Sequence, residues 1–462
     1  MKKILAILTA LLLVSCSLNH DEVVVDVSSE VNHLNSEEQI RKTVTELLNK
    51  IDPQTRGTVR TIENIETITY GQMFGGSSRA QIPTTGNNFG VPLLHIAIFE
   101  NNNGFALLTP LFDEDDYLVE DWEDEEEDDG GSSSTTTTPI RLLALVDRGT
   151  ISAADITRYT NDYDIGNNDM SISDVYDGED DDFLIGGSEA NTHVAGLISS
   201  YLYNKVTFPE NEAVYNDVED VANDNTVGPL LSTKWWQTNP FNYYFDTMYN
   251  STNKRFAGCT TIAIAQIMTY LQNRSLSYYF NVPSSITWTQ IEAEQFSPST
   301  TFENMNDVEK ATAKMIRTIA DDMGVIYFGD DGTLATAAMA KRYLENYPGY
   351  SIDKDTGGRN AARLRKIVNS INNNKPVFMS AISKVVDGHS WVVDGYMKNE
   401  NSESAVQDYL IHCNFGWGGD NDGWYFLNVL DSDKNNNDLL DTGSEVAESF
   451  KYTWLFRYLF FR

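Results

Sequence analysis

The stretch FAGCTTIAIAQIM, from Phe256 to Met268, decides the fold of the second half of this chain. Gly258 stands directly before Cys259, and the residues from Cys259 to Met268 include neither glycine nor proline. The glycine permits a tight turn, and the run after it is mostly apolar. The pattern therefore predicts a buried helix that begins at Cys259.

The setting of Cys259 also suits a nucleophile. A thiol at a helix N-terminus lies at the positive end of the helix dipole, which stabilises the thiolate and lowers the pKa. A lone cysteine is more often a small buried apolar residue, so its position alone leaves both interpretations open. Cys16, Cys259 and Cys413 are too few for a disulfide framework. We expect Cys259 and Cys413 to be free thiols; a bridge between them is the alternative.

A nucleophilic thiol needs a base, and one of the six histidines has distinctive surroundings. His389 lies in DGHSWVVDGY, directly after Gly388 and before the strand-like run from Ser390 to Val393. Such a strand would fix the backbone of His389 on a sheet. A histidine that begins a strand is also common as a structural residue, so its assignment as the base depends on Cys259.

A third candidate lies in IHCNFGWGGDNDGWYF, from Ile411 to Phe426. An amide on a neighbouring strand holds an imidazole in its working tautomer in many nucleophile–base–orienter sets. Asn414 is the candidate for this role, and Trp417 is placed to shield the contact from water. The glycines at 416, 418 and 419 suit a tight bend after the strand. A glycine-rich turn with a packing tryptophan is the alternative.

These pieces, taken together, resemble the streptopain family of papain-like cysteine peptidases. The resemblance rests on Gly258-Cys259 with AIAQIM, on Gly388-His389 in a GH-x-x-V-x-DG strand, and on NFGWGG with Asp422-Gly423 behind it. The segment KWWQTNPFN, residues 234–242, is similar to the family's Q-x-x-P-[YF]-N segment. The match is strong from residue 230 to the end and weak before it. Phe415 departs from the family's tryptophan but keeps an aromatic wall.

The resemblance implies an α+β fold, in which an α+β propeptide domain precedes a papain-like catalytic domain made of a helical part plus an antiparallel sheet. It also implies a peptidase that acts by acyl transfer on protein or peptide substrates. Cys259 would attack the carbonyl and His389 would move the protons. Asn414 would orient His389, and the Gln237 side chain would stabilise the oxyanion together with the backbone N–H of Cys259. No metal or cofactor is expected.

Two alternatives from other classes remain open. A Cys-His-Asn set also serves acyltransferases such as transglutaminase-like enzymes, which pass the acyl group to an amine. A catalytically inactive papain-like domain would act as a surface-binding protein.

The N-terminus predicts the compartment. Residues 1–15 have a basic head and a short apolar core, which is typical of a signal peptide. LVSC, ending at Cys16, resembles the lipobox of bacterial lipoproteins, which implies acylation of Cys16 and a lipid anchor in the cell envelope. An ordinary secretory signal with a chance cysteine is the alternative.

Changes in residue composition divide the chain after the signal peptide into two parts. We expect a propeptide domain over residues 16–225 and a peptidase domain over residues 226–462. The propeptide would act as inhibitor of its own enzyme, so that the chain is made as a zymogen. A polar, acidic linker begins at residue 205, where proteolysis would separate the halves.

The first half shows both helical and strand patterns. Apolar spacing predicts a helix from Ser36 to Ile51, and strands are expected over residues 93–99, 105–108 and 141–147. A second helix is expected from Ser188 to Tyr203. Residues 113–139 begin with a dense run of carboxylates and are expected to form a solvated insertion, because like charges repel.

Net charge limits the partners. The formal charge of −35 and the pI near 4.3 exclude a nucleic-acid partner, since phosphate binding needs a cationic face. Residues 431–441 begin like a calcium loop but lack the glycine at its sixth position and the glutamate at its twelfth. A polar loop beside the cleft is the favoured interpretation there.

Overall fold

The computed structural model describes residues 37–51, 60–74, 90–110, 140–161, 194–199, 201–202, 226–248, 253–271, 280, 282–295, 300–328, 332–346, 350–355, 360–382, 388–399, 408–430 and 454–462. The signal peptide, Cys16, the acidic insertion at 113–139, the linker from 205 to 225 and the calcium-like loop at 431–441 lie outside these residues. None of the helices within them is both long and apolar enough to cross a membrane.

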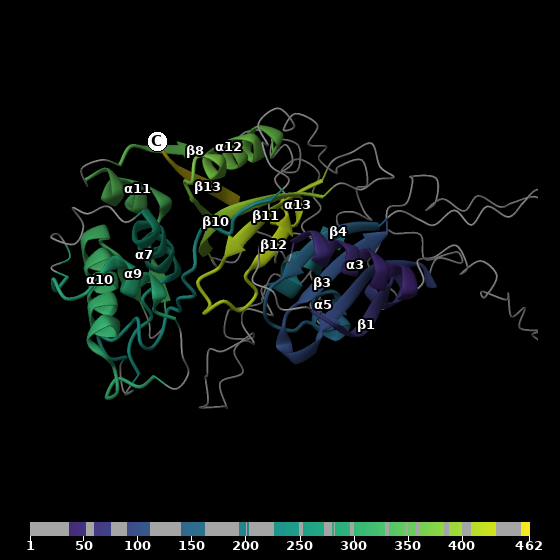
Figure 1. Cartoon of the computed structure of the whole chain (residues 1–462), viewed down its shortest axis with the longest axis horizontal. Helices are drawn as coiled ribbons and strands as arrows, with labels where there is room; N and C mark the ends of the chain where they lie inside the picture. The colour runs from purple at the N-terminus through teal and green to yellow at the C-terminus, as the bar shows by residue number, and fades with distance from the viewer. Residues whose placement is uncertain are drawn as a thin grey trace, which may run out of the picture.

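One antiparallel sheet of eleven strands runs through both halves of the described chain (Figure 1). Its order is β1-β2-β3-β4-β12-β11-β10-β9-β13-β8, and β5 pairs with β10 off this path. The bounds are β1 Ile62–Thr69, β2 Pro92–Phe99, β3 Phe105–Pro110, β4 Ile140–Val146, β5 Thr226–Val227, β8 Ile352–Asp355, β9 Val377–Ile382, β10 Gly388–Asn399, β11 Asp408–Asn414, β12 Gly423–Phe426 and β13 Trp454–Phe461.

Two groups of helices lie on opposite sides of the sheet in Figure 1, and α12 and α13 pack between them, α12 against β9 and β10 and α13 against β11 and β12. Figure 1 shows α7, α9, α10 and α11 together at one end, and α3 and α5 with β1, β3 and β4 at the other. A small hairpin, β6 with β7, stands apart from the main sheet. The remaining bounds are α3 Glu37–Ile51, α4 Tyr70–Phe74, η3 Glu100–Asn102, α5 Ala153–Asn161, α7 Cys259–Leu271, α9 Trp288–Ala293, α10 Asp307–Met323, β6 Ile326–Phe328, β7 Gly332–Leu334, α11 Ala337–Glu345, α12 Asn360–Asn372 and α13 Leu427–Leu430.

The elements expected in the first half are confirmed. The helix predicted from residue 36 is α3, and its residues Ile40, Val44 and Leu48 are buried at the expected helical spacing. The three predicted strands are β2, β3 and β4. Residues 194–199 and 201–202 are helical, which agrees with the described part of the helix expected from 188 to 203. Strand β1 was not predicted, because its alternation of isoleucine with polar residues is short and irregular.

The two halves of the chain share one sheet through the pairing of β4 with β12. Val146 lies opposite Gly423, and Ala144 lies opposite Tyr425. A Cβ atom at Gly423 would come within 2.5 Å of the Leu145 carbonyl oxygen, so the absence of a side chain there allows the strands to approach. The apolar core on one face of this junction combines α3 and β2–β4 with Met397, Leu410 and Trp424. The domain boundaries stay a prediction; the shared sheet was not foreseen.

Helix α7 is the centre of the second half. It begins at Cys259, as predicted, and its residues from Thr260 to Thr269 are all buried. It packs against β10, α9, α10 and α11. The long helix α10 is fixed by a capping box at Asn306 and ends at Gly324, whose positive φ of 77° suits a left-handed cap. A helix covered on this many sides has a fixed N-terminus, which positions the cysteine.

Candidate active site

The turn before α7 presents Cys259. Gly258 has a φ of 87°, a backbone conformation that side chains rarely allow, and a Cβ atom there would come within 3.0 Å of the Thr333 hydroxyl. The Ala257 N–H donates to the Gln237 carbonyl oxygen at 2.8 Å, which ties the Gln237 segment to this turn. Cys259 is partly buried, and both Cys259 and Cys413 are free thiols, as predicted.

The thiol lies beside the strand that carries His389. Ser390, the residue after His389, and Thr260 both hydrogen-bond to Cys259, and their hydroxyls are 2.9 Å apart. Burial raises the pKa of the Cys259 thiol, and these hydrogen bonds only partly oppose the shift. The expected lowering of this pKa by the helix dipole is therefore outweighed in this structure, because desolvation of a buried thiolate is the larger effect.

His389 sits on β10 among aromatic rings. Its imidazole stacks on Trp417, with ring centroids 4.6 Å apart, and lies parallel to Trp391 at 6.0 Å. Its Nε2 atom is 3.0 Å from the Phe415 carbonyl oxygen. A carbonyl only accepts hydrogen bonds, so Nε2 carries the proton in this contact. In the neutral ring the lone pair is then on Nδ1.

Burial also sets the charge of this imidazole. It lowers the pKa of His389 to about 4, and the hydrogen bond to Phe415 only partly opposes the shift. Burial thus disfavours the charged forms of both Cys259 and His389 in this structure, since it raises the pKa of the thiol and lowers that of the imidazole.

Asn414 lies at the end of β11, next to β10 as expected, but it does not bond to His389. Its Oδ1 accepts hydrogen bonds from the Gln266 side chain at 3.0 Å and from the Gly416 N–H at 3.2 Å. Its Nδ2 donates to the Thr233 carbonyl oxygen at 2.8 Å. The reason is local: the chain turns after Asn414 so that the carbonyl of the next residue, and not the amide, faces the imidazole. Direct orientation by Asn414 is thus replaced by the Phe415 carbonyl.

Asn414 still acts on the same peptide group. Its Oδ1 accepts a hydrogen bond from the Gly416 N–H. This N–H and the Phe415 carbonyl, which contacts His389, belong to the same peptide group. The amide therefore fixes the plane of the group that holds the imidazole. Gly416, Gly418 and Gly419 have φ values of 73°, 67° and 93°, which agrees with the bend predicted for these glycines.

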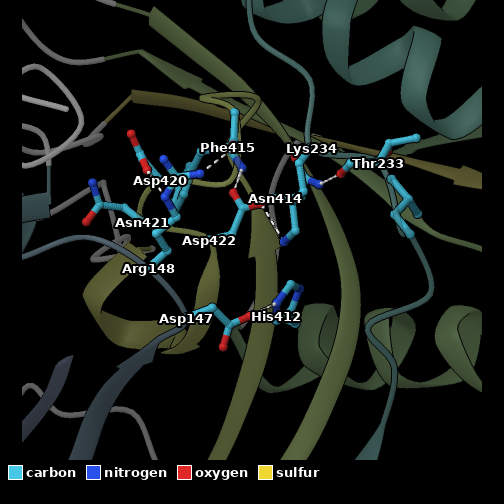
Figure 2. Close-up of polar contacts among 12 residues, drawn as sticks. Asp147, Arg148, Thr233, Lys234, His412, Asn414, Phe415, Asp420, Asn421 and Asp422 are labelled. Carbon is cyan, nitrogen blue, oxygen red and sulfur yellow. Dashed lines mark hydrogen bonds and ion pairs between the residues drawn. The ribbon is translucent and has the colours of Figure 1, made fainter. Parts of the chain in front are cut away.

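The loop from Phe415 to Asp422 is tied down by one carboxylate. The buried Asp422 accepts the Phe415 N–H on Oδ1 at 2.9 Å and the Lys234 ammonium on Oδ2 at 2.9 Å (Figure 2). The Gly418 N–H donates to the Trp235 carbonyl oxygen at 2.9 Å. These contacts join the loop to the strand-like segment that leads to Gln237. Sequence reasoning gave Asp422 no role, although its place in the GGxxDG pattern was the available signal.

Sequence reasoning also missed a second buried cluster, around His412. Its Nδ1 is 2.6 Å from the Asp394 carboxylate. Its Nε2 is 3.4 Å from the carboxylate of Asp147 in the first half, and Figure 2 shows this pair. Arg60, also in the first half, contacts Asp147 at 2.7 Å. Burial alone would lower the pKa of His412, but the two carboxylates raise it to about 9. This histidine is charged at neutral pH and links the two halves.

Among the described residues, no group of three or more histidine, cysteine, aspartate or glutamate side chains is arranged to hold a metal ion. The site thus has Cys259 bonded to Ser390, the residue next to His389, with His389 stacked on Trp417 and the Gln237 segment tied to the turn before Cys259. Phe415 makes the contact with His389 that was expected for Asn414.

Comparisons with known proteins match the part of the chain that carries these residues. Residues 235–425 match the model of the Peptidase C10 family. Streptopain of Streptococcus pyogenes is 26% identical over 193 residues, which cover 37% of this chain and 46% of streptopain. The match thus spans less than half of that relative's length.

Two solved structures are also similar. A prointerpain A fragment of Prevotella intermedia has a TM-score of 0.46 and 16% identity, and covers 79% of this chain and 94% of the fragment. The active wild-type interpain A cysteine protease of the same organism has a TM-score of 0.37 and 19% identity, and covers 52% of this chain and 96% of the protease.

Proposed function

On the premise that residues 235–425 belong to the peptidase C10 family, of streptopain-like cysteine peptidases, we propose that this chain is a cysteine endopeptidase made as a zymogen. One observation carries the proposal: within the matched segment, the thiol at the start of α7 lies against Ser390, the neighbour of His389, whose Nε2 is held by the Phe415 carbonyl oxygen. A thiol beside such a base is the arrangement that covalent acyl transfer requires.

The contacts support the following mechanism for this proposal. His389 takes the thiol proton on Nδ1 while the Phe415 carbonyl holds the proton on Nε2. The Cys259 thiolate attacks the peptide carbonyl, and His389 returns the proton to the leaving amine. Water activated by the same nitrogen then releases the acyl group. The Gln237 side chain and the Cys259 N–H stabilise the oxyanion, since the Gln237 backbone is already tied to Ala257.

The first half supplies the inhibitory part in this proposal. It shares a sheet with the second half, and its loop at Arg148 contacts the loop that holds His389: Arg148 pairs with Asp420 at 2.9 Å and donates to the Gly418 carbonyl oxygen. Cleavage after residue 205 would allow the first half to leave and would release these contacts of the glycine-rich loop.

The decisive experiment is inhibitor labelling. The protein, after limited proteolysis, is treated with an irreversible thiol-protease inhibitor, and the adduct is located by mass spectrometry while casein hydrolysis is followed. We expect one adduct, on Cys259, and loss of hydrolysis in step with labelling. Cys413→Ala is the matched control, since Cys413 lies within β11, opposite Val393 of β10, and is fully buried; it keeps both labelling and activity. Casein hydrolysis by folded Cys259→Ala protein would disprove the assignment.

Two finer proposals have separate tests. A zymogen gives a fragment of about half the mass, with its N-terminus between residues 205 and 228, as activity rises. Uncut full-length protein that is equally active contradicts that proposal alone.

A lipid anchor at Cys16 in the bacterial cell envelope, with the catalytic half released by the same cleavage, predicts that Cys16→Ser moves the protein from the membrane to the soluble fraction. Unchanged membrane association of this variant contradicts the anchor.

A further inference from the structure

Asp422 joins the two segments that flank the proposed active site. One of its oxygens accepts the Phe415 N–H and the other accepts the Lys234 ammonium, each at 2.9 Å. The carboxylate is fully buried, whereas the lysine side chain is 33% exposed. Lys234 lies three residues before Gln237, and Phe415 is the residue whose carbonyl meets His389. A single carboxylate thus spans the oxyanion side and the histidine side of the site.

The hydrogen bond to Phe415 determines where its carbonyl points. The N–H of Phe415 is held by Asp422, and the next peptide N–H, that of Gly416, is held by Asn414. With both N–H groups fixed, the carbonyl between them has one direction, and that direction is toward Nε2 of His389. Residues 416, 418 and 419 are glycines with positive φ, so the loop itself has little intrinsic stiffness.

The geometry points to Asp422 as a positioning residue for His389, acting through the Phe415 peptide, with Lys234 as the counter-ion that holds the carboxylate in place. The inference rests on the proposed function, because it concerns which nitrogen of His389 exchanges a proton with the thiol. Asp422 does not touch the substrate or the reacting atoms. Its effect is on orientation, so its loss lowers the rate of the chemical steps more than the binding of substrate.

A structural role of the ion pair is separable from this positioning role. Replacing a buried ion pair by apolar residues of similar volume is often neutral or stabilising, whereas removing one partner leaves an unpaired charge. We therefore use a common background, Lys234→Met, which removes the ammonium and keeps the aliphatic stem. In that background Asp422→Leu and Asp422→Asn have nearly the same size, and only asparagine can accept the Phe415 N–H.

The test compares these two double variants as full-length proteins that are all processed by the same external protease. We expect kcat to fall about tenfold to a hundredfold in Lys234→Met/Asp422→Leu, with KM within about twofold, because misplacement of a catalytic group acts on the transition state. In Lys234→Met/Asp422→Asn, kcat recovers to within about fivefold of wild type. Asp420→Asn controls for loss of a carboxylate from the same loop; its partner is Arg148, and it leaves kcat unchanged.

A second readout needs no activity. Nitrogen-15 spectra of the histidine rings report which nitrogen of His389 carries the proton. We expect a single Nε2–H form in wild type and in the asparagine variant, and a mixture of tautomers in the leucine variant. If the leucine variant does not fold, Asp422→Ala in the same background replaces it, since it also lacks the acceptor.

The outcomes separate the two proposals. Equal kcat and equal ring spectra for the leucine and asparagine variants, at comparable unfolding midpoints, overturn the positioning role while peptide hydrolysis stands. A wild-type protein that hydrolyses no peptide overturns the proposed function, and the ring spectra then decide the positioning role without it.

Discussion

His389 and His412 lie on neighbouring antiparallel strands, and both are buried, yet their pKa values are shifted in opposite directions. His389, on β10, is 8% exposed and has a pKa lowered to about 4; His412, on β11, is 1% exposed and has a pKa raised to about 9. Burial pushes both values down. His389 faces aromatic rings and one carbonyl, whereas His412 faces the carboxylates of Asp394 and Asp147. The groups that contact each imidazole, more than its degree of burial, therefore decide the direction of its pKa shift.

The difference assigns separate tasks to the two rings. A neutral histidine with one nitrogen unprotonated is able to take a proton from a thiol, which is the task proposed for His389. A charged histidine between carboxylates cannot do this without losing its ion pairs. His412 therefore holds the sheet junction together, and the predictions below test this division.

The largest effect expected is on catalysis. His389→Gln lowers peptide hydrolysis at least about 10⁴-fold, as the loss of a catalytic histidine does elsewhere, with little change in the unfolding midpoint. His412→Gln has the opposite profile: the free energy of unfolding falls by about 3 to 5 kcal/mol, because two carboxylates lose their buried partner. Its hydrolysis rate per folded molecule stays within about tenfold. Activity assays and urea unfolding of both variants measure this contrast. If the two variants lose similar amounts of hydrolysis and of stability, the two histidines do not have separate tasks.

The two carboxylates of the His412 cluster should also differ from one another. Asp394 is completely buried and also accepts the Leu231 N–H at 2.9 Å, whereas the Asp147 side chain is 24% exposed. We expect Asp394→Asn to lower the free energy of unfolding by about 3 kcal/mol or more, since a charged histidine loses its closer partner.

Asp147→Asn is the matched variant from the other half of the chain, and its expected loss is smaller. It removes the longer His412 contact and the 2.7 Å contact with Arg60. Denaturant unfolding gives both values. A larger loss for Asp147→Asn would show that the junction, and not the interior of the second half, carries the stability of the cluster.

The pH dependence of stability has opposite signs for the two histidines. Because the folded pKa of His412 lies above the ordinary value of 6.5, its contribution is complete below pH 6.5 and is lost as pH rises through about 9. The folded pKa of His389 lies below 6.5, so its contribution is complete above pH 6.5 and is lost as pH falls toward about 4. Each shift corresponds to about 3 kcal/mol.

We expect the wild-type free energy of unfolding, measured in urea from pH 4 to pH 9.5, to be highest near neutrality. In His389→Phe protein, the free energy of unfolding should fall less steeply between neutrality and pH 4, because one proton fewer is taken up on unfolding. Its dependence on pH above neutrality should be unchanged. Some acid slope remains, because burial lowers the pKa of His95 on β2 to about 4 as well. An unchanged acid side in His389→Phe protein would mean that this imidazole is already accessible to protons.

The smallest effect is expected at the surface of the same junction. Arg148 pairs with Asp420 at 2.9 Å, but the arginine side chain is 49% exposed. Ion pairs of this kind contribute about 1 kcal/mol or less and are screened by salt. Arg148→Ala should therefore change the unfolding midpoint little at 0.15 M salt. A loss as large as that of Asp394→Asn would place the main link between the halves at this loop.

Local patterns made much of this molecule predictable. The start of α7 follows from a glycine before a long run without helix breakers, and β2, β3 and β4 follow from short apolar runs between turn residues. Cys259 and His389 are candidates from the sequence because each has a distinctive neighbourhood there, and their catalytic roles stay a prediction. The bend after Asn414 follows from its glycines.

What escaped prediction depends on groups that are far apart in the chain. The Phe415 contact with His389 is made by a backbone carbonyl, which every residue has, so no side-chain pattern marks it. The His412 cluster joins residues 147, 394 and 412, and a histidine in an ordinary strand gives no sign of such partners. The pKa of Cys259 was expected to fall because the dipole is visible in the sequence, whereas the depth of burial is not.

The pairing of β4 with β12 has a consequence for a chain cut between its halves. In the intact chain the backbone N–H and C=O groups of residues 423–425 are matched by those of residues 144–146. Departure of the first half would turn β12 into an edge strand with unmatched groups, which are prone to pair with any extended chain. The strand is only four residues long and begins with a glycine. This short length limits self-association, and it gives a newly freed second half one place where another extended polypeptide is able to add to its sheet.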